Sequence, residues 1–244
     1  MMLRREVLAS IAAFAAATPT LGWADEPGLQ VGGPARFDPR SLIQRARALA
    51  AEAYTPRPQI PKSWRDLSYD QYRKIWFDSR NALWEGTDAP QRVDVFPPGL
   101  YFPQAVAMFE VEDVFDKTDK FPDVELDDTL GYSGLRLRAE LHKPGIFEEY
   151  AVFQGASYFR GLGAGETYGL SARGLAVNTG EPEGEEFPDF IGLWLERPAH
   201  GEATIVLHAL LDSPSVTGAY TFHITPGEVL RMHVAAHLFA RTEL

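Results

Sequence analysis

Residues 204–224 read TIVLHALLDSPSVTGAYTFHI, two apolar runs on either side of a short polar segment. In each run apolar side chains recur at every second position, as Tyr220, Phe222 and Ile224 do, which is the period of a β-strand. Between the runs, Asp212 is followed by Ser and Pro, residues that favour turns. The stretch predicts strands over 204–210 and 219–224, with Asp212 as a turn former.

The same pattern extends over most of the chain after Arg92. Apolar residues keep a period of two, and Gly or Pro recurs about every eight to twelve residues. Further strands are expected at 91–96, 105–111, 134–138 and 150–153. We therefore predict a mainly β protein, a β-sandwich with a short helical N-terminal preface.

The preface contains two helix starts. Asp38 before Pro39 is a typical N-cap and first-turn pair, and apolar residues at helical spacing follow as far as Ala53. Ser68 with Gln71 three residues later forms a capping box, which predicts a second, short helix.

Composition excludes several classes of function. The 244 residues carry a net charge of −11, whereas a nucleic-acid partner or an anionic membrane surface requires a basic footprint. There is no cysteine, so thiolate catalysis and zinc–cysteine sites are excluded. We expect no cofactor and no metal site.

The first 24 residues have the features of an export signal. Arg4 and Arg5 precede an apolar stretch over 7–14, and Gly22-Trp23-Ala24 offers a small-x-small cleavage site. The apolar part is too short to span a membrane, so no stable membrane insertion is expected. The paired arginines resemble a twin-arginine signal, with an ordinary secretory signal as the alternative. Residues 25–36, rich in Gly and Pro, are expected to be flexible.

The last residues predict one more strand. Over 229–241, apolar side chains alternate with Arg231, His233 and His237. Although a helix would place His233 and His237 together for a metal, a strand separates them by roughly 13 Å. A strand so near the chain's last residue also leaves a sheet edge to be covered, which suggests that the sequence stops within a larger domain.

The glycine-rich segment GASYFRGLGAGETYGLSARGLAVNTG (155–180) raises the question of a phosphate loop. Its central glycines are spaced two apart, no helix pattern follows, and no Walker lysine is present, so phosphate binding is disfavoured. We interpret the segment as two strands, 156–160 and 168–177, joined by a glycine turn.

Aromatic and arginine side chains near this turn suit a sugar ligand. Sugar CH faces stack on rings, and hydroxyls accept hydrogen bonds from guanidinium groups. The candidate binding residues are Tyr158, Arg160, Tyr168 and Arg173, with Tyr132 and Arg136 behind them. For each of these residues, packing in the core is the alternative interpretation. For two further aromatic residues, Trp194 and Tyr220, we favour the core interpretation.

Several motifs carry a specific resemblance. They are LGYSGLR (130–136), GASYFR (155–160), YGLSARGLA (168–176), EEFP (185–188), FIGLW (190–194), ALLDSP (209–214) and TGAY (217–220). In order and spacing they resemble the periplasmic osmoregulated glucan biosynthesis proteins G and D, over essentially all of the mature chain that begins at Asp25. The leader is more similar to that of the D member.

The resemblance implies a galactose-mutarotase-like β-sandwich followed by an immunoglobulin-like domain. It also implies a periplasmic role in making or trimming β-1,2-linked glucan, in a family that includes inverting β-1,2-glucanases with an aspartic acid pair. The family's His-Asp-Ser-Asp-Gly-like stretch is missing from these residues. We therefore expect 37–244 to be the N-terminal part of the sandwich domain, without the remainder and the immunoglobulin-like domain.

Three hypotheses stay open at this point. The chain binds glucan in a cleft without catalysing a reaction, with no catalytic residue of its own. Alternatively it is a glycoside hydrolase, either in a full-length form or through an acid pair such as Asp128 and Glu186, which inversion would require to lie roughly 6.5–9.5 Å apart. The third is a scaffold that holds partner proteins of glucan synthesis and export.

Overall fold

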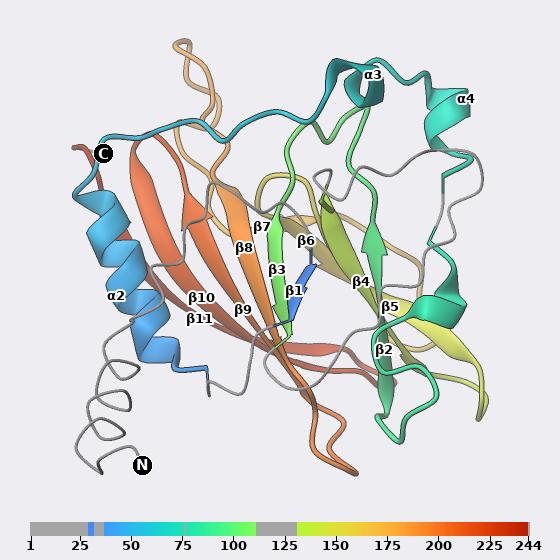
Figure 1. Cartoon of the computed structure of the whole chain (residues 1–244). Helices are drawn as coiled ribbons and strands as arrows, with labels where there is room; N and C mark the ends of the chain where they lie inside the picture. Colours follow the sequence, from blue (N-terminus) through green and yellow to red (C-terminus); the bar gives the residue numbers. More distant parts are fainter. Residues whose placement is uncertain (1–28, 32–36, 76, 111–130, 244) are drawn as a thin grey trace, which may run out of the picture.

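The computed structural model describes residues 29–31, 37–75, 77–110 and 131–243. Two β-sheets dominate this part of the chain, and the predicted mainly β sandwich with a helical preface is confirmed (Figure 1). The expected signal peptide and Asp128 lie outside the described residues. Of the segment 25–36, only residues 29–31 are described.

The first sheet, sheet A, has six strands in the order β1-β3-β8-β9-β10-β11. Their bounds are Leu29–Val31, Ala107–Glu110, Asp189–Glu196, Ile205–Asp212, Val216–Thr225 and Arg231–Ala240. The pairs β1–β3 and β3–β8 are parallel, and the others are antiparallel. At one edge, β11 pairs with β10 alone among the described strands.

The second sheet, sheet B, is antiparallel and has five strands in the order β2-β4-β5-β6-β7. Their bounds are Gln91–Phe96, Gly134–Glu140, Phe147–Gln154, Tyr158–Gly161 and Ala172–Arg173. A β-bulge shifts the β4–β5 register after Leu137.

The main core lies between the two sheets. Alternate residues of sheet B, including Leu135, Leu137 and Phe153, belong to one buried cluster with alternate residues of sheet A, including Leu207 and Phe222. Phe153 and Phe222 meet edge to face, with ring centroids 5.1 Å apart. Because side chains alternate along a strand, the residues between these core positions point away from the opposite sheet.

Helix α2 (Pro39–Ala50) covers the other face of sheet A (Figure 1). The predicted N-cap is confirmed, since the Asp38 carboxylate accepts a hydrogen bond from Arg40 N. Leu42 and Ala46 are buried against a second cluster that includes Trp194, so the core interpretation of this tryptophan holds.

The shorter helices are α3 (Lys62–Arg65), α4 (Tyr69–Tyr72) and the 3₁₀ turn η1 (Ser79–Asn81). The capping box of Ser68 and Gln71 is present at the start of α4, as predicted. None of the described helices combines the length and the apolar content needed to cross a membrane.

Two sequence expectations need correction. Asp212 is the last residue of β9 and forms a buried ion pair with Arg241, 2.9 Å long, rather than acting only as a turn former. The strand expected over 168–177 shrinks to the two residues of β7, because only Ala172 and Arg173 pair with β6. Strand β8, which the sequence pattern did not predict, lies at the centre of sheet A.

The glycine turn after β6 packs against the β10–β11 connection. Ala164 N donates to Gly227 O (2.9 Å) and Gly163 N to Glu166 Oε2 (3.1 Å), so these amides are already used within the protein. A Cβ on Gly163 would lie 2.3 Å from Glu228 O, which explains why glycine is required there. The turn therefore has a structural role, in agreement with the rejection of a phosphate loop.

Candidate binding face

The face of sheet B that points away from sheet A is polar. On β2, Val93 and Val95 point into the core, so Asp94 between them points outward. The register pairs Asp94 with Arg136, Val152 with Arg160, and Tyr158 with Arg173, and paired residues share a face. We call the outward-facing set of Asp94, Arg136, Arg138, Glu149, Tyr158, Arg160, Tyr168, Arg173 and Glu185 the outer face of sheet B.

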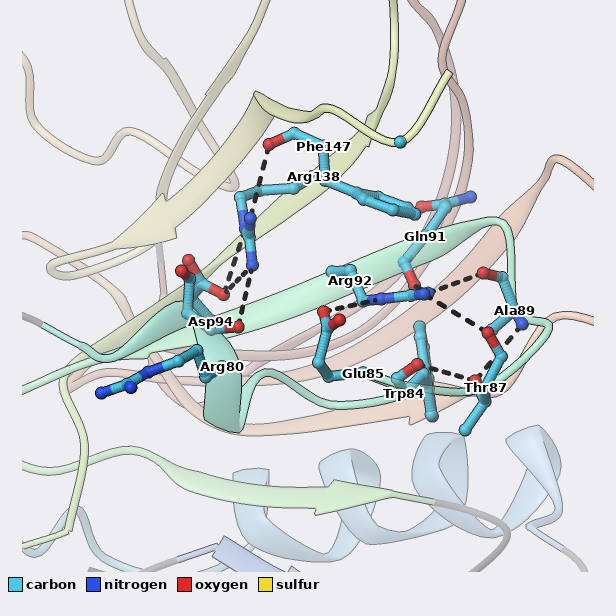
Figure 2. Close-up of polar contacts among 12 residues, drawn as sticks. Arg80, Trp84, Glu85, Thr87, Ala89, Gln91, Arg92, Asp94, Arg138 and Phe147 are labelled. Carbon is cyan, nitrogen blue, oxygen red and sulfur yellow. Dashed lines mark hydrogen bonds and ion pairs between the residues drawn. The ribbon is translucent and has the colours of Figure 1, made fainter. Parts of the chain in front are cut away.

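A buried carboxylate anchors one end of this face. The side chain of Asp94 is 0% exposed. It accepts hydrogen bonds from Arg136 Nε (2.7 Å), Arg138 Nε (3.1 Å) and Arg138 Nη2 (2.9 Å). Figure 2 shows Arg138 reaching from Asp94 to the carbonyl of Phe147. Such charge-assisted contacts hold both guanidinium groups in fixed orientations.

Neighbouring Arg92 is fixed in a different way. Its guanidinium donates to Glu85 Oε2 (3.0 Å) and to the carbonyls of Ala89 and Gln91, and it lies 4.2 Å from the centre of the Phe147 ring (Figure 2). With 7% of its side chain exposed, Arg92 is a structural residue at this end of β2.

Glu149 continues the row across the middle of the sheet. Its Oε2 lies 3.3 Å from Arg136 Nη1, and its carboxylate also faces the hydroxyl of Tyr168. Burial, and then this carboxylate, raise the pKa of Tyr168 well above its ordinary value. The hydroxyl is buried and makes no hydrogen bond of normal geometry with the described residues. The Tyr168 hydroxyl is therefore a hydrogen-bond donor that lies beside the Glu149 carboxylate.

The opposite end of the face combines arginines with aromatic rings. Arg160, an exposed residue, lies over the Tyr168 ring at 4.4 Å, and Arg173 lies 5.5 Å from the centre of the Tyr158 ring. Arg173 Nη1 is 2.5 Å from Glu185 Oε1, and this contact with a carboxylate raises the pKa of Arg173. Phe187, half exposed, lies on Arg173 as well, so rings and guanidinium groups alternate here.

Five of the six candidate binding residues thus share one face. Tyr132 is the exception, since it bridges to Val106 and its ring packs against the main core. Sequence reasoning missed Asp94, Glu149 and Phe187 as members of the face. The polar Asp94 between two valines of a predicted strand was an available signal, because a polar residue at an alternate position faces outward.

The separation of the proposed acid pair, Asp128 and Glu186, stays untested, because Asp128 lies outside the described residues. Its expected partner, Glu186, has another role: its Oε1 accepts hydrogen bonds from Ser215 N (3.2 Å) and Ser215 Oγ (2.7 Å). Glu185 and Glu186 are thus both bonded and half-buried. Within the described residues, no group of three or more His, Asp or Glu side chains is placed to hold a metal ion.

Fold and face together define a two-layer β-sandwich protein with a row of arginines, carboxylates and rings across one sheet. Residues 37–244 match the model of a family described as "Periplasmic glucan biosynthesis protein, MdoG". The chain belongs to this family, as the sequence motifs predicted.

Known relatives agree with this assignment. The chain is 42% identical over 255 residues to the glucans biosynthesis protein G of Rhodopseudomonas palustris, covering 100% of the chain and 50% of that protein. It is 43% identical to a protein of the same name from Vibrio cholerae and 42% identical to one from a Shewanella species, covering 85% of the chain and 40% of each relative. The chain therefore spans half or less of the length of these curated relatives.

Proposed function

We propose that this chain takes part in periplasmic glucan biosynthesis by binding the glucan on the outer face of sheet B. One observation carries the proposal: in a chain of the glucan biosynthesis family, Tyr158, Arg160, Tyr168 and Arg173 gather on one face with two carboxylates. Rings that stack on sugar CH faces lie beside donors and acceptors for sugar hydroxyls.

The two ends of the face have different roles in this proposal. Arg136 and Arg138 are held by the buried Asp94, so they form the fixed frame. Arg160 is exposed and lies over the Tyr168 ring, and among the described residues it forms no ion pair, so its guanidinium N–H groups can donate to a ligand. We therefore place the sugar near Arg160 and Arg173, along the β6–β7 end.

Calorimetric titration of the chain with β-1,2-linked glucose oligosaccharides tests the proposal. We expect Arg173→Ala to weaken binding roughly tenfold, since it removes a charged hydrogen-bond donor and loosens Glu185. Arg231→Ala is the matched control, because Arg231 is an exposed arginine of β11 in the other sheet, and its affinity should be that of the unaltered chain.

The outcomes separate the remaining hypotheses. Unchanged affinity in Arg173→Ala and Arg160→Ala would refute this face as the binding site. A chain that binds no β-1,2-glucan but retains a partner protein of glucan synthesis would favour the scaffold. Release of reducing ends from the oligosaccharide would indicate a hydrolase.

We also propose that residues 1–24 direct export to the periplasm by the twin-arginine route. The pair Arg4 and Arg5 ahead of a short apolar stretch supports this proposal. A reporter fused after residue 24 should reach the periplasm, and replacing both arginines by lysine should retain it in the cytoplasm. Continued export of the lysine variant would indicate an ordinary secretory signal instead.

A further inference from the structure

Strand β11 carries two histidines on the same face of sheet A. His233 and His237 are four residues apart and exposed. Along a strand this spacing corresponds to roughly 13 Å, so these two side chains do not share a ligand. Each of them, however, has a different neighbour across the sheet.

The register of β10 and β11 gives His233 a histidine partner. His223 of β10 is paired with His233, whereas His237 is paired with Ala219. Directly paired residues of antiparallel strands have Cβ atoms about 4.5–5.5 Å apart and point to the same side of the sheet. His223 is exposed as well, so two imidazoles from neighbouring strands stand side by side in solvent.

We propose that His223 and His233 form a two-histidine site for a divalent late first-row metal ion such as Ni²⁺, Cu²⁺ or Zn²⁺. Imidazole nitrogen is a preferred ligand of these ions, at about 2.0–2.1 Å. Two cis ligands at that distance require nitrogens about 3 Å apart, which imidazoles on Cβ atoms about 5 Å apart can reach by side-chain rotation. Water completes the coordination.

The surroundings limit the site to these two ligands. His208, diagonal to His223, is buried, and its ring nitrogens lie 2.6 Å from Glu196 Oε1 and 2.9 Å from Thr221 Oγ1. Arg231, two residues before His233 on the same face, adds a positive charge that weakens attraction of a cation. We therefore expect a site of modest affinity that depends on both histidines.

Titration of the untagged chain with NiCl₂ by calorimetry at pH 7.5 tests the inference. We expect one Ni²⁺ per chain, and an apparent Kd weaker by at least about tenfold in both His223→Ala and His233→Ala, because the second imidazole binds intramolecularly. His237→Ala is the matched control, since it removes an exposed histidine of the same strand and face, and its affinity should be unchanged.

Three results would overturn the site. They are absence of Ni²⁺ binding to the unaltered chain, unchanged binding in the double variant His223→Ala/His233→Ala, and equal weakening in His237→Ala. Both positions are exposed, so neither substitution removes core contacts. A circular dichroism spectrum equal to that of the unaltered chain checks that each variant is folded.

Discussion

Replacing Asp94 by Asn should destabilise the fold strongly, although it exchanges only one carboxylate oxygen for an NH₂ group. The Asp94 side chain is 0% exposed and accepts three hydrogen bonds from Arg136 and Arg138. In the variant, the amide NH₂ would face guanidinium donors, and two arginines with 30% and 13% exposed side chains would lose their counter-charge.

The magnitude follows from burial. Removing one partner of a fully buried ion pair costs about 3–5 kcal/mol. Arg136 keeps Glu149 as a partner and some contact with water, which relieves part of this cost. We therefore expect the free energy of unfolding to fall by about 2–4 kcal/mol. With a urea m-value of about 2–3 kcal/mol/M, the unfolding midpoint should decrease by about 1 M.

Urea unfolding followed by tryptophan fluorescence at pH 7 measures this change. The matched control is Asp66→Asn, since Asp66 pairs with Lys62 where both side chains are more than half exposed, and such pairs contribute little. If the midpoint in Asp94→Asn falls no further than in Asp66→Asn, the proposed anchoring of the face is wrong.

Three further predictions concern the turn and the buried ionisable groups, each measured by urea unfolding. Gly163→Ala should cost about 1–3 kcal/mol, because its Cβ would meet Glu228 O at 2.3 Å; an unchanged midpoint would contradict the close packing. Arg241→Met should cost about 3–5 kcal/mol at neutral pH, since it leaves Asp212 buried without its cation. Burial already raises the pKa of Asp212, so Asp212 should be protonated more readily at pH 5 than at pH 7 in the Arg241→Met variant. The loss of unfolding free energy should therefore be smaller at pH 5, and an equal loss at both pH values would argue against a buried, uncompensated Asp212 charge as its cause. Burial lowers the pKa of His208 below 6.5, so the unfolded chain takes up the proton first and stability should fall as pH drops through about 6.5. The free energy of unfolding of His208→Gln should fall less between pH 7.5 and 5.5, and an unaltered slope would exclude His208 as the cause.

Local patterns predicted much of the fold because they depend on neighbouring residues. The alternation in residues 91–96 corresponds to β2, and the N-cap at Asp38 and the capping box at Ser68 lie where expected. Strand β8 escaped notice because, as a central strand, it is buried on both faces, and Leu193, Trp194 and Leu195 in succession do not alternate.

The candidate face was predictable only in part. Tyr158, Arg160 and Arg173 all belong to the glycine-rich segment 155–180, so the composition of that segment pointed to them. Asp94 and Glu149 belong to other strands, and their contacts with Arg136 depend on the register of β2, β4 and β5. No local pattern determines which residues of distant strands meet.

By itself the sequence determined the β period, the helix caps, the family and the exclusion of a shared site for His233 and His237. The tertiary structure decided which side chains became neighbours. Strand pairing places His223 beside His233 and Asp94 beside Arg136, and it turns Asp212 from an expected turn former into the partner of Arg241. The physical reason is that side-chain direction follows from the local period of the chain, whereas sheet register is set by packing the whole core.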